Sequence, residues 1–162
     1  MTLSFIKSNQ KRTIIEALKE QFGVNEIPYL LIQSGKEKIK AFSGSISKDE
    51  IIEISRMIRI EFLGIYLLKQ ELDYRLSFDA TQILSNQITK NILDINQEQY
   101  ELWIRGYDLE LKENTDLRGT IVIRFNGDFF GCGKSSGNKI FNYVPKERRL
   151  KTPLPSKSEI FK

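Results

Sequence analysis

The stretch GTIVIRFNGDFFGCGK, residues 119–134, decides the fold of the second half of this chain. Its first part, GTIVIRF, is rich in β-branched residues and is the strongest strand signal in the sequence. Asn126 and Gly127 follow as a dipeptide suited to the positive φ angles of a tight turn, and DFFGCGK is the returning strand. The stretch therefore predicts a β-hairpin.

Weaker strand and helix signals surround this hairpin. LELKE, from Leu109, alternates in polarity, and NKIFNYV (138–144) predicts a further strand closed by Pro145. Upstream, residues 78–88 and 95–106 predict two short helices. Strands at such short spacing, separated by Gly and Asn turns, favour a small antiparallel barrel or sandwich.

The first half has a different pattern. Apolar residues at helical spacing predict a helix over 7–22, and Ser47 with the acids after it predicts a second helix over 48–57. Between them, strands at 27–33 and 37–43 form a predicted hairpin, and a last strand is expected over 58–68. The order is α-β-β-α-β.

These patterns predict an α+β protein with two domains. The polar region near residues 70–77 is the best boundary, which gives an N-terminal α/β subdomain at 1–74 and a barrel at 75–151. Residues 152–162 carry two prolines and small polar residues, and we expect them to form a flexible tail.

The composition excludes several classes of enzyme. Histidine is absent, so Ser-His-Asp, Cys-His and HExxH arrangements are excluded. Cys132 is the single cysteine and permits neither an internal disulfide nor a multi-cysteine zinc site. The acidic residues show no metal-site or acid/base spacing. We therefore expect no metal, no cofactor and no catalytic activity.

The motif GCGKSS at 131–136 resembles a phosphate-binding loop. That motif needs G-x-x-x-x-G-K-[ST] between a strand and a helix, but Asp128 stands at its first position and strand-like sequence follows Ser135. The glycines are better interpreted as permitting a bend and close backbone approach.

A cysteine enzyme is a separate alternative. Cys132 has only Lys134 near it in sequence as an activating group, and a small core residue is the favoured interpretation. The surroundings of the thiol decide between the two.

The sequence predicts a cytoplasmic protein that does not enter a membrane. The first twelve residues lack the continuous apolar region of a secretory signal. The longest apolar candidate, FLGIYLL at 62–68, is far shorter than the roughly 20 residues that cross a bilayer. A single cysteine also suits a reducing compartment.

Positive charge gathers at the end of the chain. From Lys139 onward there are seven Lys or Arg residues against two acids, whereas residues 1–138 hold eighteen basic and nineteen acidic residues. Phe141, Asn142 and Tyr143 add stacking surfaces and an amide beside this charge. Proteins that bind unpaired or irregular RNA use this combination, although a solubilising basic tail is the alternative.

Residues 103–150 carry an ordered set of short motifs. These are R-G-x-D-L, an x-G turn, G-x-G-K, an asparagine-containing strand and P-K-x-x-R. The matching positions are Arg105, Gly106, Asp108, Leu109, Gly127, Gly131, Gly133, Lys134, Asn142, Pro145, Lys146 and Arg149. In this region the chain resembles the PUA-like RNA-binding region of RsmF-type ribosomal RNA 5-methylcytosine methyltransferases.

The resemblance implies a PUA-like β-barrel acting as a freestanding RNA-binding module, without the methyltransferase domain. Its expected ligand is structured rRNA or tRNA, in RNA modification or ribosome biogenesis. The alternative is an accessory subunit that docks on a separate RNA methyltransferase or on the ribosome through the N-terminal subdomain. The predicted RNA-binding residues are Arg105, Lys134, Lys139, Asn142, Lys146, Arg148, Arg149 and Lys151.

Overall fold

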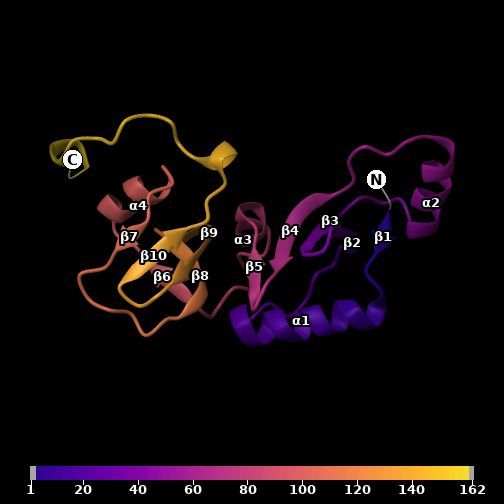
Figure 1. The fold of residues 1–162 in the computed structure, drawn as a ribbon, viewed down its shortest axis with the longest axis horizontal. Helices are drawn as coiled ribbons and strands as arrows, with labels where there is room; N and C mark the ends of the chain where they lie inside the picture. The colour runs from indigo at the N-terminus through magenta and orange to yellow at the C-terminus, as the bar shows by residue number, and fades with distance from the viewer. Residues whose placement is uncertain (1–2, 161–162) are drawn as a thin grey trace.

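The computed structural model describes residues 3–160 and has two lobes, each built on a five-stranded sheet. Figure 1 shows the lobes side by side along the longest axis, with α3 and β5 between them. Helices and two sheets together confirm the predicted α+β class.

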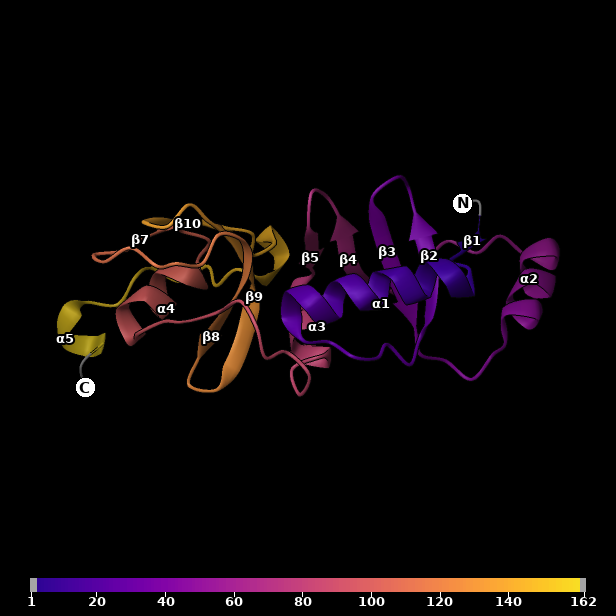
Figure 2. The same ribbon diagram turned by 90° about the horizontal axis from the view of Figure 1, so that it is seen from below.

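The first lobe is a fully antiparallel sheet in the order β1-β2-β3-β4-β5. Helix α1 runs across the strands of this sheet, as Figure 2 shows, and α2 lies at the outer end of the lobe. The elements are β1 (Ser4–Phe5), α1 (Ser8–Phe22), β2 (Leu30–Ser34), β3 (Lys38–Phe42), α2 (Lys48–Met57), β4 (Ile65–Gln70) and β5 (Tyr74–Leu76).

Both helices of this lobe form for local reasons. In α1 the apolar stripe of Ile14, Leu18 and Phe22 is buried, and Gly23 ends the helix with φ 85°, a conformation that glycine adopts without strain. In α2 the Ser47 hydroxyl accepts from the Glu50 amide, while the Glu50 carboxylate accepts from the Ser47 amide. The predicted helices over 7–22 and 48–57 are confirmed within one residue.

The second lobe is a curled sheet with the strand order β6-β8-β9-β10-β7, in which β6 is parallel to β8. The predicted hairpin is confirmed: Asn126 and Gly127 have φ of 48° and 86° at its turn. The elements are α3 (Phe78–Ile83), β6 (Ile92–Asp94), α4 (Gln97–Trp103), β7 (Leu109–Glu110), β8 (Gly119–Phe125), β9 (Asp128–Ser135), β10 (Lys139–Asn142), η1 (Lys146–Arg148) and α5 (Lys157–Ile160).

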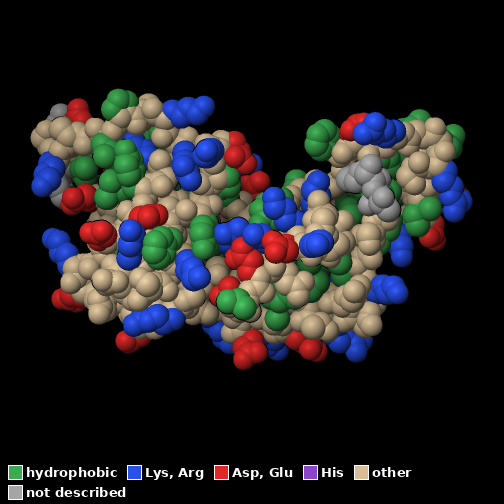
Figure 3. Space-filling model, viewed as in Figure 1, with side chains coloured by type: hydrophobic (Ala, Val, Ile, Leu, Met, Phe, Trp, Pro, Cys, Tyr) green, Lys and Arg blue, Asp and Glu red, His purple; other side chains and the backbone are tan. Residues whose placement is uncertain are grey.

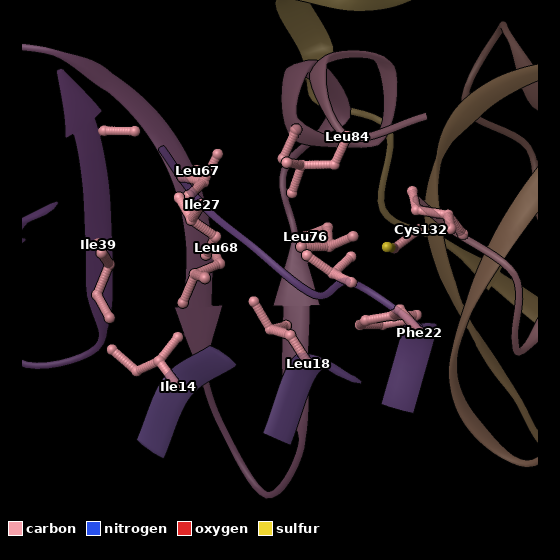
Figure 4. Close-up of a cluster of buried hydrophobic side chains, with 14 of the residues drawn as sticks. Ile14, Leu18, Phe22, Ile27, Ile39, Leu67, Leu68, Leu76, Leu84 and Cys132 are labelled. Atoms are coloured by element: carbon pink, nitrogen blue, oxygen red, sulfur yellow. The ribbon is translucent and has the colours of Figure 1, made fainter. Parts of the chain in front are cut away.

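A shared hydrophobic core joins the lobes. Val122, Phe129 and Cys132 of the second sheet belong to the same buried cluster as Phe22 and Leu76 of the first lobe. Figure 4 shows Cys132 pointing toward Leu76 and Phe22. A second cluster surrounds the fully buried Trp103 inside the second lobe. Because one core spans both lobes, the packing sets the position of each lobe against the other.

The predicted strand at 58–68 was wrong in its first half. Pairing starts at Ile65, because residues 58–64 lack a neighbouring strand and leave Phe62 in solvent. Strand β5 lies within the polar stretch that marks the predicted domain boundary, and it completes the first sheet at Leu76. In the predicted tail, residues 157–160 form one helical turn.

Candidate nucleic-acid interface

A groove of about 370 Å³ lies between the two lobes. Strands β3, β4 and β5 form one side, and the end of β10 with the segment leading through η1 forms the other. Figure 3 shows Lys and Arg side chains in the middle of the molecule near the hollow between the lobes, with Asp and Glu side chains beside them. The basic and aromatic residues that line the groove are Lys38, Tyr66, Arg75, Phe78, Tyr143, Lys146 and Arg149. We call Lys38, Arg75, Lys146 and Arg149 the groove cations.

The charge of this groove has one sign. Among the residues that the structure describes, none that lines the groove is Asp or Glu. A concave surface with charge of one sign focuses the electrostatic field and raises the local concentration of an oppositely charged ligand. The groove is therefore suited to a polyanion.

The first lobe contributes Lys38 through the alternation of strand β3. Its neighbour Ile39 packs into the buried core beneath the sheet with Ile14 of α1, so Lys38 points to the other face. The Lys38 ammonium lies 5.3 Å from the centre of the Tyr66 ring, within the range of a cation–π contact. Burial raises the pKa of the Tyr66 hydroxyl, and the positive charge of Arg75 opposes that rise.

Arg75 bridges the two sides of the groove. It projects from β5, and its guanidinium lies 4.2 Å from the centre of the Tyr143 ring in the second lobe. One nitrogen is also 3.5 Å from the Glu71 carboxylate. Stacking and ion pairing hold this side chain in a defined position.

The second lobe contributes Lys146 and Arg149 from the chain around η1. The Arg149 Nε donates to the Val144 carbonyl at 2.9 Å, and the side chain passes over Gly106, where a Cβ would collide with it. Lys146 is exposed, and among residues 3–160 no carboxylate lies within ion-pair distance of it. Lys146 is therefore available to a ligand.

Arg105 was predicted to contact RNA, but the structure assigns it to the protein framework. Its side chain is only 7% exposed and pairs with Glu101 at 2.6 Å. It also donates to the carbonyls of Thr152 and Pro153, at 2.8 and 3.2 Å. These partners occupy the guanidinium within the protein, and a contact between Arg105 and RNA stays a prediction.

Asn142, a second predicted RNA-binding residue, also has its side chain bonded within the protein. Its side-chain nitrogen donates to the carbonyls of Trp103 and Tyr107, both at 2.8 Å, and its side-chain oxygen accepts from the Val144 amide. The amide is therefore used to join α4, the following turn and β10. It lines the groove without a free polar group to offer.

The other predicted cations lie outside the groove. Arg148 pairs with Asp79 at 2.8 Å, and Lys139 lies 3.8 Å from Asp108 and over the Phe141 ring. Lys134 is exposed on β9 and lines a neighbouring cleft, and Lys151 is exposed beyond η1. Only Lys146 and Arg149 of the predicted cations line the groove itself. Whether the outer cations contact RNA stays a prediction.

Sequence reasoning missed the contribution of the first lobe. Lys38, Arg75 and Tyr66 lie in a region whose overall charge is slightly negative, so the charge count over residues 1–138 concealed them. The alternation in KEKIK, which separates lysines from Ile39 on opposite faces of a strand, was the available signal.

Cys132 is a core residue at the floor of the groove. It is 2% exposed, and burial among apolar side chains raises the pKa of its thiol to about 12. A thiol that stays protonated at neutral pH is a poor nucleophile, so the geometry gives no support to a cysteine enzyme.

The glycines on either side of Cys132 allow neighbouring side chains to pack closely against strand β9. A Cβ on Gly133 would lie 2.6 Å from the Trp103 ring, and one on Gly131 would lie 3.0 Å from Phe78. Residues 131–135 of this motif belong to strand β9, not to a loop before a helix. The interpretation of GCGKSS as a packing motif is therefore confirmed. In the described part of the chain, no group of three acidic or cysteine side chains is arranged to hold a metal ion.

The family model for the methyltransferase RsmF PUA domain matches residues 90–150. Over residues 90–150 the chain is therefore similar to the PUA domain of RsmF-type methyltransferases. The match covers β6 to η1, so the region that is similar to the PUA domain forms one side of the groove. Within residues 3–160, no helix is long and apolar enough to span a membrane.

Individual relatives extend the likeness beyond the PUA domain. Ribosomal RNA small subunit methyltransferase F of Shewanella oneidensis is 31% identical over 74 residues, which are 46% of this chain and 15% of that protein. The same enzyme of Psychromonas ingrahamii is 21% identical over 143 residues, which are 85% of this chain and 28% of that protein. The chain thus spans less than a third of the length of these relatives.

A solved structure supports the same fold for both lobes. A conserved PUA domain protein from Thermoplasma acidophilum has a TM-score of 0.53 and 14% sequence identity, and the match covers 87% of this chain and 93% of that chain. At this identity the likeness concerns the fold. The predicted PUA-like α+β architecture is confirmed.

Proposed function

We propose that this protein binds structured RNA, ribosomal or transfer RNA, through the groove between its lobes, as a non-catalytic factor in RNA modification or ribosome biogenesis. The observation that carries the proposal is the lining of the groove. It joins four cations and three aromatic rings from both lobes with no acid among the described residues.

Physical chemistry supports RNA as the ligand. Lysine and arginine neutralise phosphates and release condensed counterions, and aromatic rings offer stacking surfaces to bases that are not paired. The names of the relatives, which are small-subunit ribosomal RNA methyltransferases, favour ribosomal RNA over transfer RNA. A cytoplasmic location belongs to the same proposal and can be checked by cell fractionation.

The test is charge reversal on both sides of the groove. Lys38→Glu combined with Lys146→Glu removes one cation from each lobe, and both side chains are exposed. The affinity for a ribosomal RNA fragment should fall, and the slope of log K against log salt should decrease by about 1.4 to 1.8, because two phosphate contacts are lost.

A matched control changes the net charge by the same amount elsewhere. Arg12 and Lys19 are exposed on α1, which covers the opposite face of the first sheet, so Arg12→Glu with Lys19→Glu should keep the salt slope near that of the parent protein. Equal losses for the two double variants would mean that the groove has no special role and would contradict the proposal.

A second candidate is the accessory role, with docking on a separate RNA methyltransferase or on a ribosomal particle. Met57, the last residue of α2, and Phe62, in the segment between α2 and β4, are 83% and 86% exposed, an exposure that favours a protein contact there. Co-sedimentation with purified small ribosomal subunits tests this role. Binding that Phe62→Ser abolishes, while the groove variant leaves it intact, would favour docking over RNA recognition.

A further inference from the structure

A second cleft, of about 420 Å³, neighbours the groove, and Tyr143 lines both spaces. Leu72, at the turn between β4 and β5, is fully exposed at the edge of this cleft, and Lys134 reaches it from β9. The lining residues are Glu71, Leu72, Asp73, Gly119, Thr120, Lys134 and Tyr143.

The two acids of this cleft are already paired within the protein. The Asp73 oxygens accept from the Thr120 amide at 3.0 Å and from its hydroxyl at 2.8 Å, which ties the lobes together. The Glu71 carboxylate lies 2.8 Å from the Lys69 ammonium and 3.5 Å from Arg75. The groups that the cleft offers to a ligand are therefore an apolar side chain, an aromatic ring and the exposed Lys134.

We propose that this cleft receives one unpaired base of the RNA whose phosphates lie in the cationic groove. The inference rests on the proposed function and adds the class of RNA to it. A nucleobase has flat apolar faces, which Leu72 and the Tyr143 ring can cover, and Lys134 is placed to meet the adjoining phosphate. A base inside a duplex is stacked on both faces, so fully paired RNA cannot fill the cleft.

In this proposal the groove and the cleft recognise different parts of the RNA. The groove cations attract phosphates without regard to pairing, whereas the cleft needs a base that has left the helical stack. The Tyr143 ring belongs to both spaces. The guanidinium of Arg75, which lines the groove, lies 4.2 Å from the centre of this ring. RNA with a bulge or an unpaired end should therefore bind more tightly than its fully paired counterpart.

The test compares two hairpin RNAs that differ by one nucleotide. The first carries a single-nucleotide bulge, and in the second a complementary nucleotide opposite the bulge restores pairing. We expect the parent protein to prefer the bulged hairpin by about tenfold, the scale of one base stacked on an aromatic ring. Leu72→Ser should reduce the preference to less than about threefold and leave the affinity for the paired hairpin unchanged. Leu154→Ser, at another exposed leucine, should keep the full preference.

The outcomes separate the two proposals. Equal, salt-dependent binding of both hairpins by the parent protein would overturn the base cleft while the proposed function stands. An undiminished preference in Leu72→Ser would also overturn the cleft. Failure to bind either hairpin, or any ribosomal RNA fragment, would overturn the proposed function and the inference with it. Because Leu72 is fully exposed, its replacement should not unfold the protein.

Discussion

Two sets of polar residues in this protein have similar chemistry and opposite roles. Arg105 and Asn142, which we call the framework pair, have their polar atoms bonded to backbone carbonyls and to Glu101. Lys38 and Lys146, on the two sides of the groove, are exposed to solvent. The difference teaches that residue type and sequence position do not show which polar side chains are free for a ligand; the hydrogen-bond partners in the folded state do.

Asn142→Ala should have the largest effect. We expect it to lower the free energy of unfolding by about 3 kcal/mol, because it removes three hydrogen bonds and takes away the side-chain partners of the Tyr107 carbonyl and the Val144 amide. Urea denaturation measures this change. Asn138→Ala, at an exposed asparagine, should stay within about 0.5 kcal/mol. A loss of RNA affinity in Asn142→Ala without a loss of stability would break the comparison.

Arg105→Leu should come next, with a loss of about 2 kcal/mol in the free energy of unfolding. The variant leaves the half-buried Glu101 carboxylate without its cationic partner and frees the backbone at Thr152 and Pro153. Thermal denaturation measures the stability, and faster tryptic cleavage at Lys157 reports release of the C-terminal segment. Arg12→Leu, on the exposed face of α1, is the control and should change neither value. A stable Arg105→Leu with weakened RNA binding would instead support the predicted RNA contact of Arg105.

Cys132 lies where the core and the groove meet, and it supplies a pH test. Its pKa is about 12 in the folded protein and about 9 when unfolded, so the folded state holds the thiol proton more tightly. The contribution of the protonated thiol to the free energy of unfolding is complete below about pH 9 and is lost as pH rises through the pKa of the folded state. At pH 10 the free energy of unfolding should therefore be about 1.4 kcal/mol lower than at neutral pH.

The measurement is urea denaturation between pH 7 and pH 10 for the parent protein and for Cys132→Ala. The alanine variant is expected to be less stable at pH 7, because it leaves a small cavity, but its stability should fall less steeply with pH. Parallel pH profiles would mean that the thiol is not buried, and would weaken the distinction between core and groove.

Neutralising single groove lysines should have the smallest effect. Lys38→Ala and Lys146→Ala should each lower the salt slope of RNA binding by about 0.7, because each removes one phosphate contact. Their free energies of unfolding should stay within about 0.5 kcal/mol of the parent value, because both side chains are exposed. Filter binding across a salt series measures the slope. A stability loss comparable with that of Asn142→Ala would mean that these lysines stabilise the fold as the framework pair does, which would contradict the comparison.

Local sequence patterns predicted the elements whose causes are local. The run of β-branched residues before Asn126-Gly127 predicted the β8–β9 hairpin, and the Ser47 cap predicted α2. The segment 58–64 has a strand-like composition but finds no neighbouring strand, so it stays unpaired. Pairing partners are a long-range property, which residue pattern alone does not contain.

The sequence by itself determined the α+β class, the absence of histidine chemistry, the PUA-like resemblance of residues 103–150 and the basic end of the chain. The tertiary structure alone decided which basic residues share a groove. Lys38 and Lys146 are far apart in the chain and approach each other because Cys132 and Phe129 pack into the core of the first lobe. Packing between distant segments thus determines which side chains are left for a ligand, since the buried ones already have partners.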